Sequence, residues 1–317
     1  MEMSSPGSTV NHGGSVRAVY RFAVLTCLGT VLLLMAGALV TSNDAADSVP
    51  DWPLAYGKLI PPLIGGIRFE YAHRVIAGVV AVSTLILALW LTFASVRPLA
   101  KRLGWTALAL VLVQAALGAL RVKEVYPVLS ATLHATLAQI FFMTLVGLCF
   151  YLSPWWAKQL PRLEDARAPS LPTLAALTTL AILAQLILGA AFRHGAFGID
   201  PHLVGAAVVT AMVVWTGAAA KRRFRGHSDL RWCTLFLHAF LGLQILLGFA
   251  AWYAVRVLAT ESEQPTLPYV SLTVAHVLGG ALTLAASVIF TLASFRLIPG
   301  SLAKAPSVHT EGVGALR

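Results

Sequence analysis

Charged residues are scarce in this 317-residue chain: Asp, Glu, Lys and Arg make up 11% of it, against roughly a quarter of a soluble domain. This scarcity, with 58% hydrophobic residues, excludes an ordinary soluble protein and indicates a polytopic membrane protein. Cysteine is also rare. Cys27, Cys149 and Cys233 lie in or beside apolar runs, which excludes an external disulfide framework and favours inert buried thiols. The short polar N-terminus predicts no cleavable signal or transit peptide.

Eight apolar runs are each long enough, at about 17–25 residues, to cross a bilayer as a helix. Lys and Arg are concentrated before the first run, in every second loop and after the last run. The positive-inside rule therefore places both termini in the cytoplasm. It also explains the net charge of +10 better than nucleic-acid binding, so no nucleic acid is expected as a partner. The runs cover approximately residues 20–40, 69–93, 103–120, 130–152, 171–192, 201–219, 233–253 and 270–295.

A helical hairpin repeats four times along the chain. Gln114–Gly118, Gln185–Gly189 and Gln244–Gly248 share the pattern Gln-x-x-x-Gly, and Met35–Val40 is a degenerate version. Each is followed by an external loop and a run with one histidine near its start. Two hairpins build a four-helix bundle, so we expect an all-α membrane protein with two pseudo-symmetric bundles. The expected domains are a cytoplasmic tail (1–19), an N-terminal bundle (20–155), a cytoplasmic linker (156–170), a C-terminal bundle (171–296) and a second cytoplasmic tail (297–317).

Four histidines begin the even-numbered runs and so lie at one depth near the outer surface. A small residue follows each one a turn later on the same face, which leaves room for a flat macrocycle. Two imidazoles on facing helices of a bundle are a standard way to hold haem iron. Zinc is less favoured, because its structural sites need four N or S ligands and no cysteine accompanies these histidines. The histidines are His73, His134, His202 and His276, and the small residues are Ala77, Ala138, Ala206 and Gly280.

Simpler interpretations of these features stay open. A single histidine in an apolar helix is often a hydrogen-bonded core residue, and small residues also serve helix packing. The three glutamines could form plain hydrogen bonds between helices. His238 lies alone toward the cytoplasmic side, so we interpret it as structural. Four arginines near the outer ends could bind haem propionates or reach to lipid headgroups; they are Arg74, Arg121, Arg193 and Arg256.

Glu70 is the most informative single residue. It precedes His73 by three residues, so a helix places both on one face. An ionisable residue at the mouth of a membrane helix is a candidate functional site. Glu70 could be an exposed first-turn acid that the helix dipole favours. Alternatively, it could accept a proton, or stabilise positive charge developing on a substrate beside His73.

Several short segments resemble the haem A synthase family. The most specific is the loop Pro-Asp-Trp-Pro-Leu followed by Glu-x-x-His-Arg, and the likeness extends over all eight runs and the four histidines. The segments are Leu39–Thr41, Ser48–Leu54, Tyr56–Gly57, Pro61–Pro62 and Glu70–Arg74.

The resemblance implies an oxidoreductase of haem A biosynthesis in the bacterial cytoplasmic membrane. Such an enzyme oxidises the C8 methyl group of haem o to a formyl group, through hydroxylated intermediates and with oxygen from water, and gives haem a for terminal oxidases. Haem o would lie between His73 and His134, and a permanent haem b between His202 and His276. Glu70 would be catalytic, together with His73.

The same resemblance also predicts which residues contact the haems and which partners the protein has. Arg74 and Arg121 are expected to contact the substrate, and Arg193 and Arg256 the cofactor. Haem o and membrane lipid are the expected partners, with a haem o synthase, cytochrome oxidase assembly proteins and a second copy of the chain left open.

Two departures from the family pattern concern the first external loop. Val49 and Ala55 stand at the approximate positions of a cysteine pair that many bacterial members carry, so a loop disulfide cannot take part here. Asn43–Asp47 replaces a stretch that is usually rich in glycine.

Two other functions stay open. A bis-histidine b-type cytochrome would usually need ligands at two depths, and a non-catalytic haem carrier or assembly factor would need the histidines but not Glu70. A transporter is less favoured, because the sequence has no broken helix or midplane charge.

Overall fold

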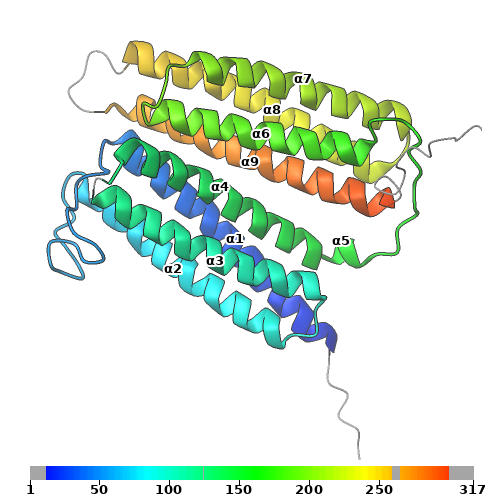
Figure 1. The fold of residues 1–317 in the computed structure, drawn as a ribbon, viewed down its shortest axis with the longest axis horizontal. Helices are drawn as coiled ribbons and strands as arrows, with labels where there is room; N and C mark the ends of the chain where they lie inside the picture. The colour runs from blue at the N-terminus through cyan, green and yellow to red at the C-terminus, as the bar shows by residue number, and fades with distance from the viewer. Residues whose placement is uncertain (1–11, 124, 259–264, 300–317) are drawn as a thin grey trace, which may run out of the picture.

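The computed structural model describes residues 12–123, 125–258 and 265–299, and this part of the chain is helical apart from its loops (Figure 1). Eight helices are long and apolar enough to cross a membrane, which confirms the predicted all-α fold with eight spans. They are α1 (His12–Ser42), α2 (Ile67–Phe93), α3 (Pro98–Val122), α4 (Pro127–Leu152), α6 (Leu171–Arg193), α7 (Asp200–Arg223), α8 (Ser228–Tyr253) and α9 (Leu267–Leu297), with a short α5 (Pro154–Ala157) and a π-helical turn η1 (Ala254–Leu258).

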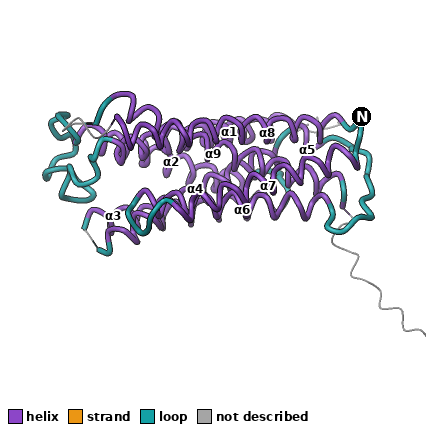
Figure 2. Tube along the Cα trace, turned by 90° about the horizontal axis from the view of Figure 1, so that it is seen from above, coloured by secondary structure: helices purple, strands orange, loops and turns teal. Residues whose placement is uncertain are grey.

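The long helices pack as two groups of four. In the first group α1 and α3 each contact α2 and α4; in the second, α6 and α8 each contact α7 and α9. The groups meet where α9 contacts α1 and α4, and where α4 contacts α6 (Figure 1). Because α9 touches both groups, 56% of its most apolar window is buried, against 11–33% for the other spans. Figure 2 shows the loops gathered at the two ends of the helices.

Helix ends extend a few residues past the predicted apolar runs. Proline occupies one of the first two positions of several helices, including α3, α4 and α7, where its missing N–H costs nothing. Basic residues continue α7 to Arg223, because cations near a helix C-terminus interact favourably with its dipole. The predicted tails lie largely outside the described residues, although α1 already begins at His12.

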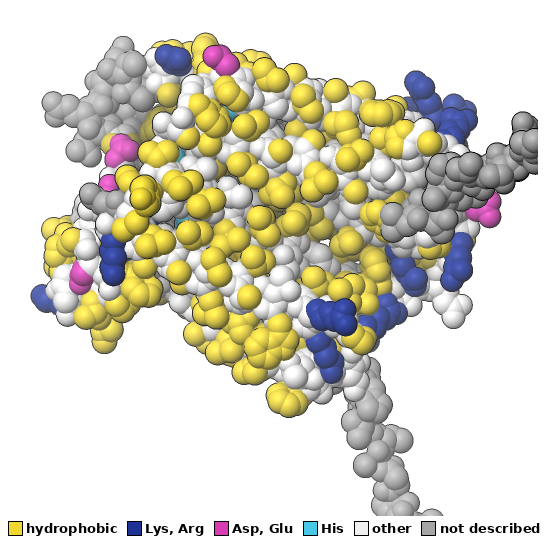
Figure 3. All heavy atoms as spheres, in the orientation of Figure 1, with side chains coloured by type: hydrophobic (Ala, Val, Ile, Leu, Met, Phe, Trp, Pro, Cys, Tyr) yellow, Lys and Arg dark blue, Asp and Glu magenta, His cyan; other side chains and the backbone are white. Residues whose placement is uncertain are grey.

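Each group has its own apolar core. The first is centred on residues such as Leu87, Leu91 and Leu145, and the second on Leu174 and Leu284, all fully buried. Hydrophobic side chains also cover the middle of the outer face (Figure 3), as a lipid-facing surface requires.

Hydroxyl groups supplement this packing between helices. They form hydrogen bonds between Thr178 and Thr216 (2.7 Å), Thr179 and Thr291 (2.9 Å), and Ser42 and Thr273 (2.8 Å).

One end of the helices, where α2, α4, α7 and α9 begin, carries the four histidines; we call it the histidine end. Lys and Arg side chains gather at the opposite end, near α5 (Figure 3). There the linker is fixed by Asp165, whose carboxylate accepts bonds from Arg223 (3.0 Å) and from the backbone N–H of Leu171 (2.7 Å). Leu163 donates to the carbonyl of Leu297 at 2.8 Å. The linker therefore joins the start of α6 to the ends of α7 and α9.

The linker contact predicts the effect of a single substitution. Asp165→Ala leaves Arg223 without its carboxylate, and the Asp165 side chain is 2% exposed, so the substitution should cost about 3 kcal/mol of unfolding free energy. We expect a lower Tm in detergent, measured by intrinsic fluorescence. Glu164→Ala, at an exposed neighbouring position, is the control and should leave the Tm unchanged. Equal Tm values for both variants would contradict the structural role of Asp165.

Candidate functional site

The four predicted histidines form two facing pairs at the histidine end. His73 of α2 and His134 of α4 have ring centroids 6.4 Å apart, with ring planes at 69°. His202 of α7 and His276 of α9 are 6.2 Å apart at 83°. In both groups the paired histidines come from diagonal helices, so the rings meet inside the group.

A glycine on the preceding helix makes room for each imidazole. A Cβ atom built on Gly189 would lie 2.9 Å from Cε1 of His202, and one on Gly118 would lie 3.4 Å from Cε1 of His134. Both distances are at or below ordinary van der Waals contact. Gly37 faces His73 and Gly248 faces His276 in the same way, each with a Cβ distance of 3.2 Å. The histidine ring therefore packs against the glycine of the Gln-x-x-x-Gly repeat.

The small residues predicted to make room beside the histidines serve a different purpose in at least one case. A Cβ on Gly280 would lie 2.7 Å from a methyl carbon of Leu186 and 3.3 Å from Nε2 of Gln244. At this position the packing interpretation of the small residue holds.

The interpretation of the glutamines as hydrogen-bonding groups between helices also holds. Nε2 of Gln114, Gln185 and Gln244 donates to the backbone carbonyl of the histidine on the next helix, at 2.8–3.0 Å.

The spacing of each pair suits two ligands of one metal ion. Two imidazoles that bind a metal from opposite sides, each through a nitrogen at about 2 Å, hold their ring centres roughly 6 Å apart. Among the described residues no group of three or more His, Cys, Asp or Glu side chains could hold a metal ion. A pair of imidazoles with no third protein ligand fits an iron porphyrin, whose macrocycle brings the remaining ligands itself.

Glu70 is buried beneath the first loop (residues 43–66), so its interpretation as an exposed first-turn acid is wrong. Its residue exposure is 4%. One carboxylate oxygen accepts the backbone N–H of Val49 at 3.0 Å, and the other pairs with Arg74 at 2.5 Å. The acid is thus fixed at the histidine end of α2 by an ion pair and a backbone hydrogen bond.

Arg74 fixes the loop above Glu70. Its guanidinium donates to the carbonyls of Asp51 (2.7 Å), Leu54 (3.0 Å) and Val49 (3.2 Å). Five N–H donors in a planar fork allow one arginine to collect several acceptors. In the structure these bonds hold the Arg74 side chain against the loop. Its predicted contact with a substrate stays a prediction.

Asp51 organises the turn that follows in the loop. Its carboxylate accepts the backbone N–H groups of Tyr56 (2.6 Å) and Gly57 (2.8 Å). The bond from Gly57, supported by the one from Tyr56 and by the charge of Arg74, lowers the pKa of Asp51. Both turn residues have positive φ, 55° at Tyr56 and 67° at Gly57, a conformation that glycine adopts without strain.

Val49 and Ala55 are buried in this loop, at 0% and 2% exposure. These are the approximate positions of the cysteine pair that the sequence lacks. Apolar burial and hydrogen bonds to Asp51 and Arg74 order the loop without a disulfide.

The other predicted arginines have distinct surroundings. Arg121 pairs with Asp47 of the first loop at 2.9 Å. Arg193 crosses to the first group, where it donates to Ser42 Oγ (2.6 Å) and to the carbonyl of Ala38 (3.3 Å). Arg256 lies in η1. Their propionate contacts stay predictions, but the structure shows that Arg193 joins the two groups.

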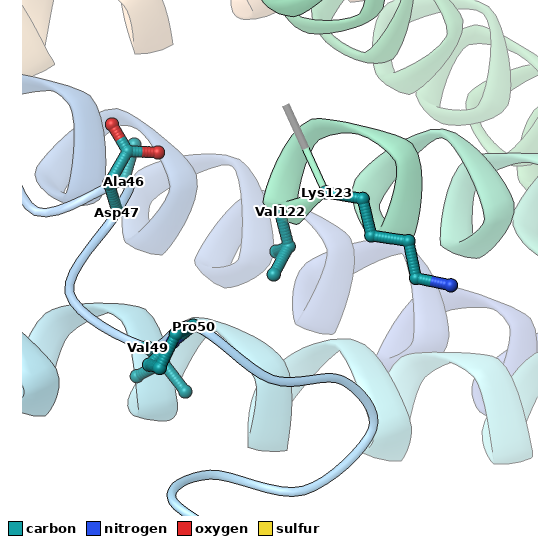
Figure 4. Close-up of a pocket in the computed structure, with 6 residues that line it drawn as sticks. All are labelled: Ala46, Asp47, Val49, Pro50, Val122 and Lys123. Carbon is teal, nitrogen blue, oxygen red and sulfur yellow. The ribbon is translucent and has the colours of Figure 1, made fainter. Parts of the chain in front are cut away.

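A cavity of about 240 Å³ lies between the first loop and the end of α3, beside the ion pair of Arg121 (Figure 4). Loop residues line one side and the last turn of α3 the other. The lining residues are Ala46, Asp47, Val49, Pro50, Val122 and Lys123.

His194 is a neighbour of the site that the sequence analysis did not single out. It follows Arg193 at the end of α6. Burial, and then the charges of Arg193 and Arg121, lower the pKa of His194 to about 4, with a further effect from His134. His194 is therefore neutral at neutral pH and lies near the first histidine pair, a placement that depends on how the two groups dock.

His238 has the structural role predicted for it. Its Nδ1 is 2.8 Å from the carbonyl of Thr234, one turn earlier in α8. The ring packs so closely against Gly217 of α7 that a Cβ there would collide with it.

Comparison with known proteins bears on this arrangement. Residues 67–200 match the family described as cytochrome oxidase assembly protein, a region that includes Glu70, His73 and His134. A haem A synthase of an Exiguobacterium species is 27% identical over 251 residues, which cover 75% of this chain and 71% of that protein. The chain is therefore similar to haem A synthases over most of its length.

Other haem A synthases are more identical to this chain than the Exiguobacterium protein is, but over shorter segments. The enzyme of Halalkalibacterium halodurans is 40% identical over 77 residues, 23% of this chain and 26% of the relative. The haem A synthase of Alkalihalophilus pseudofirmus is 36% identical over 103 residues, which cover 31% of this chain and 34% of that protein. These two matches thus span about a quarter to a third of the relatives. The eight helices able to span a membrane, together with these bacterial relatives, support a multi-pass bacterial membrane protein.

The bonds from Arg74 predict how the first loop responds to a substitution. Arg74→Ala removes three charge-assisted bonds to loop carbonyls, each of which contributes about 1.5–3 kcal/mol. We expect trypsin to cleave at the exposed Lys58 at least about tenfold faster than in the wild type, because local opening becomes easier. Arg68→Ala, at an exposed arginine whose guanidinium lies over the Phe69 ring, is the control. Unchanged cleavage in Arg74→Ala would show that other contacts hold the loop.

Proposed function

We propose that this protein is a haem A synthase, which oxidises the C8 methyl group of haem o to a formyl group and so supplies haem a for terminal oxidases. The observation that carries the proposal is the pair of facing imidazoles in each helix group, 6.4 and 6.2 Å apart. Similarity to haem A synthases supports it independently.

The substrate haem o binds between His73 and His134 in the first group. This assignment is supported by the position of Glu70, one helical turn before His73 on α2 and 4% exposed. The cavity beside Asp47 and Lys123 opens at the same end of the first group. Lys123 in its lining is a cation that could pair with a porphyrin propionate.

The second pair, His202 and His276, holds a resident haem b. This assignment is supported by the spacing of the two rings and by the glycines against which they pack. When bound, haem b supplies one-electron redox chemistry. The protein contributes the two imidazoles and an apolar surrounding.

The overall reaction requires a group that accepts protons. Converting a methyl to a formyl group with oxygen from water releases four electrons to an external acceptor and four protons. Glu70 is the candidate acceptor for protons that leave the substrate carbon or the attacking water. Arg74 keeps this carboxylate charged and oriented, and the Val49 N–H holds its second oxygen.

The two alternative functions have weaker support. A transmembrane b-type cytochrome would need ligands at a second depth, and His238 in that half is bonded to its own helix and packed on Gly217. A non-catalytic haem carrier or assembly factor would need no proton acceptor beside His73, and the buried Glu70 offers one.

A charge-removing substitution tests the role of Glu70. Glu70→Gln keeps the shape and an acceptor for Val49 but loses the proton-accepting carboxylate. We expect haem a to fall by about 10²-fold or more, the usual loss when a general base is removed. Haem o or a hydroxylated haem should accumulate while haem b remains. The measurement is pigment extraction with chromatography and mass spectrometry. Asp44→Asn, in the same loop, is the control; normal haem a in Glu70→Gln would refute the proposal.

Histidine variants separate the two sites. His276→Ala should lose the resident haem b, whereas His134→Ala should retain haem b and mainly impair the binding of haem o. His238→Ala serves as the matched control and should retain both. The measurement is the haem content of purified protein, with and without added haem o. If His276→Ala and His134→Ala both purify with wild-type haem content, the ligand assignment is wrong.

A further inference from the structure

The two histidine pairs differ in what holds their rings. In the second group the amide Nε2 of Gln185 lies 3.0 Å from Nδ1 of His202, and that of Gln244 lies 3.1 Å from Nδ1 of His276. In the first group Gln114 reaches the backbone carbonyl of His134, while Nδ1 of that histidine is buried without a hydrogen-bond partner.

The first hairpin departs further from the pattern. Aligning Gly37 with the glycines of the other repeats places Leu33 where they carry glutamine. No side-chain amide can therefore reach the ring of His73 from this position of α1.

Glycine explains why the contact forms in the second group. Gly205 and Gly279 lie three residues after His202 and His276, and a Cβ at either would collide with Oε1 of the glutamine. In the first group Ile76 and Leu137 occupy the same positions. The missing side chain lets the amide lie flat against α7 or α9, beside the imidazole.

The amide leaves one polar atom unpaired. Oε1 of Gln185 and of Gln244 is buried with no hydrogen-bond partner. An imidazole that binds a metal through Nε2 carries its proton on Nδ1 and donates it to an acceptor. A half turn of the amide about its terminal bond exchanges its nitrogen and oxygen. Oε1 then faces Nδ1–H, and this bond replaces the one from the amide nitrogen to the backbone carbonyl of the histidine.

We propose that Gln185 and Gln244 are positioning residues of the second histidine pair. Their side-chain carbonyls accept the Nδ1–H of His202 and His276, which fixes the tautomer and orientation of both rings. The first pair lacks this restraint. The inference rests on the proposed function, since it assumes that these imidazoles bind haem iron.

Leucine substitutions test the proposal. Leucine is chosen because Leu33 occupies the equivalent position of the first hairpin, which shows that the hairpin accepts this residue. Gln185→Leu and Gln244→Leu remove the acceptor. Each should weaken haem b binding by about 10–100-fold, the usual effect of losing a partner that orients a metal ligand. Each should also change the electron paramagnetic resonance spectrum and midpoint potential of the haem b that remains. Haem b titration and redox titration of the purified full-length protein measure these changes.

Two further variants separate positioning from helix packing. Gln114→Leu removes a glutamine that contacts the histidine backbone but not the ring, so it should leave haem b affinity and potential unchanged. Gln244→Glu keeps a carbonyl-type acceptor for His276 but has no amide nitrogen. It should retain haem b, with a lower midpoint potential because a carboxylate makes the ligand more basic.

The outcomes distinguish this inference from the proposed function. Wild-type affinity and potential in both leucine variants would overturn the positioning role alone. So would loss of haem b in Gln244→Glu equal to that in Gln244→Leu, because that result would assign the glutamine to helix packing. A wild-type protein that takes up no haem b at all would overturn the proposed function, and the positioning role with it.

Discussion

The arrangement of the site depends on the close contact between an imidazole and a glycine of the neighbouring helix. A histidine ring is too large to lie between two packed helices unless one of them lacks a side chain there. At Gly189 a Cβ would lie 2.9 Å from the ring of His202, so even alanine would displace it. The contact turns each ring away from the lipid and toward its counterpart on the diagonal helix. Four such contacts convert four separate histidines into two facing pairs.

Much of this frame could be predicted from the sequence, because hydropathy and charge determine which segments span a membrane. The eight spans and the common depth of the histidines follow from the apolar runs and the repeat. The partners of Glu70 could not be predicted, since its bond to the Val49 N–H depends on the path of the first loop. The bond from Arg193 to Ser42 depends on how the two groups dock. Hydropathy contains no information on loop paths, helix rotation or docking.

The first loop shows how one requirement can be met by different chemistry. A loop that covers a buried carboxylate must be ordered, and a disulfide is one way to order it. Here Arg74 binds three loop carbonyls, Asp51 closes a turn, and Val49 and Ala55 fill the space beneath. The guanidinium that holds the loop also compensates the charge of Glu70, without which burial of that acid would cost several kcal/mol. Loop order and the charge state of the acid are therefore coupled.

The two groups share one frame but differ at the residue three positions after each histidine. Glycine at 205 and 279 admits a glutamine amide beside the ring, whereas isoleucine at 76 and leucine at 137 do not leave that room. A restrained imidazole pays little entropy when it binds a metal, which favours a group that stays bound. An imidazole without this restraint can turn as a ligand enters or leaves. Under the proposed function, the differences in these side chains would adapt one repeated hairpin to retaining haem in one group and exchanging it in the other.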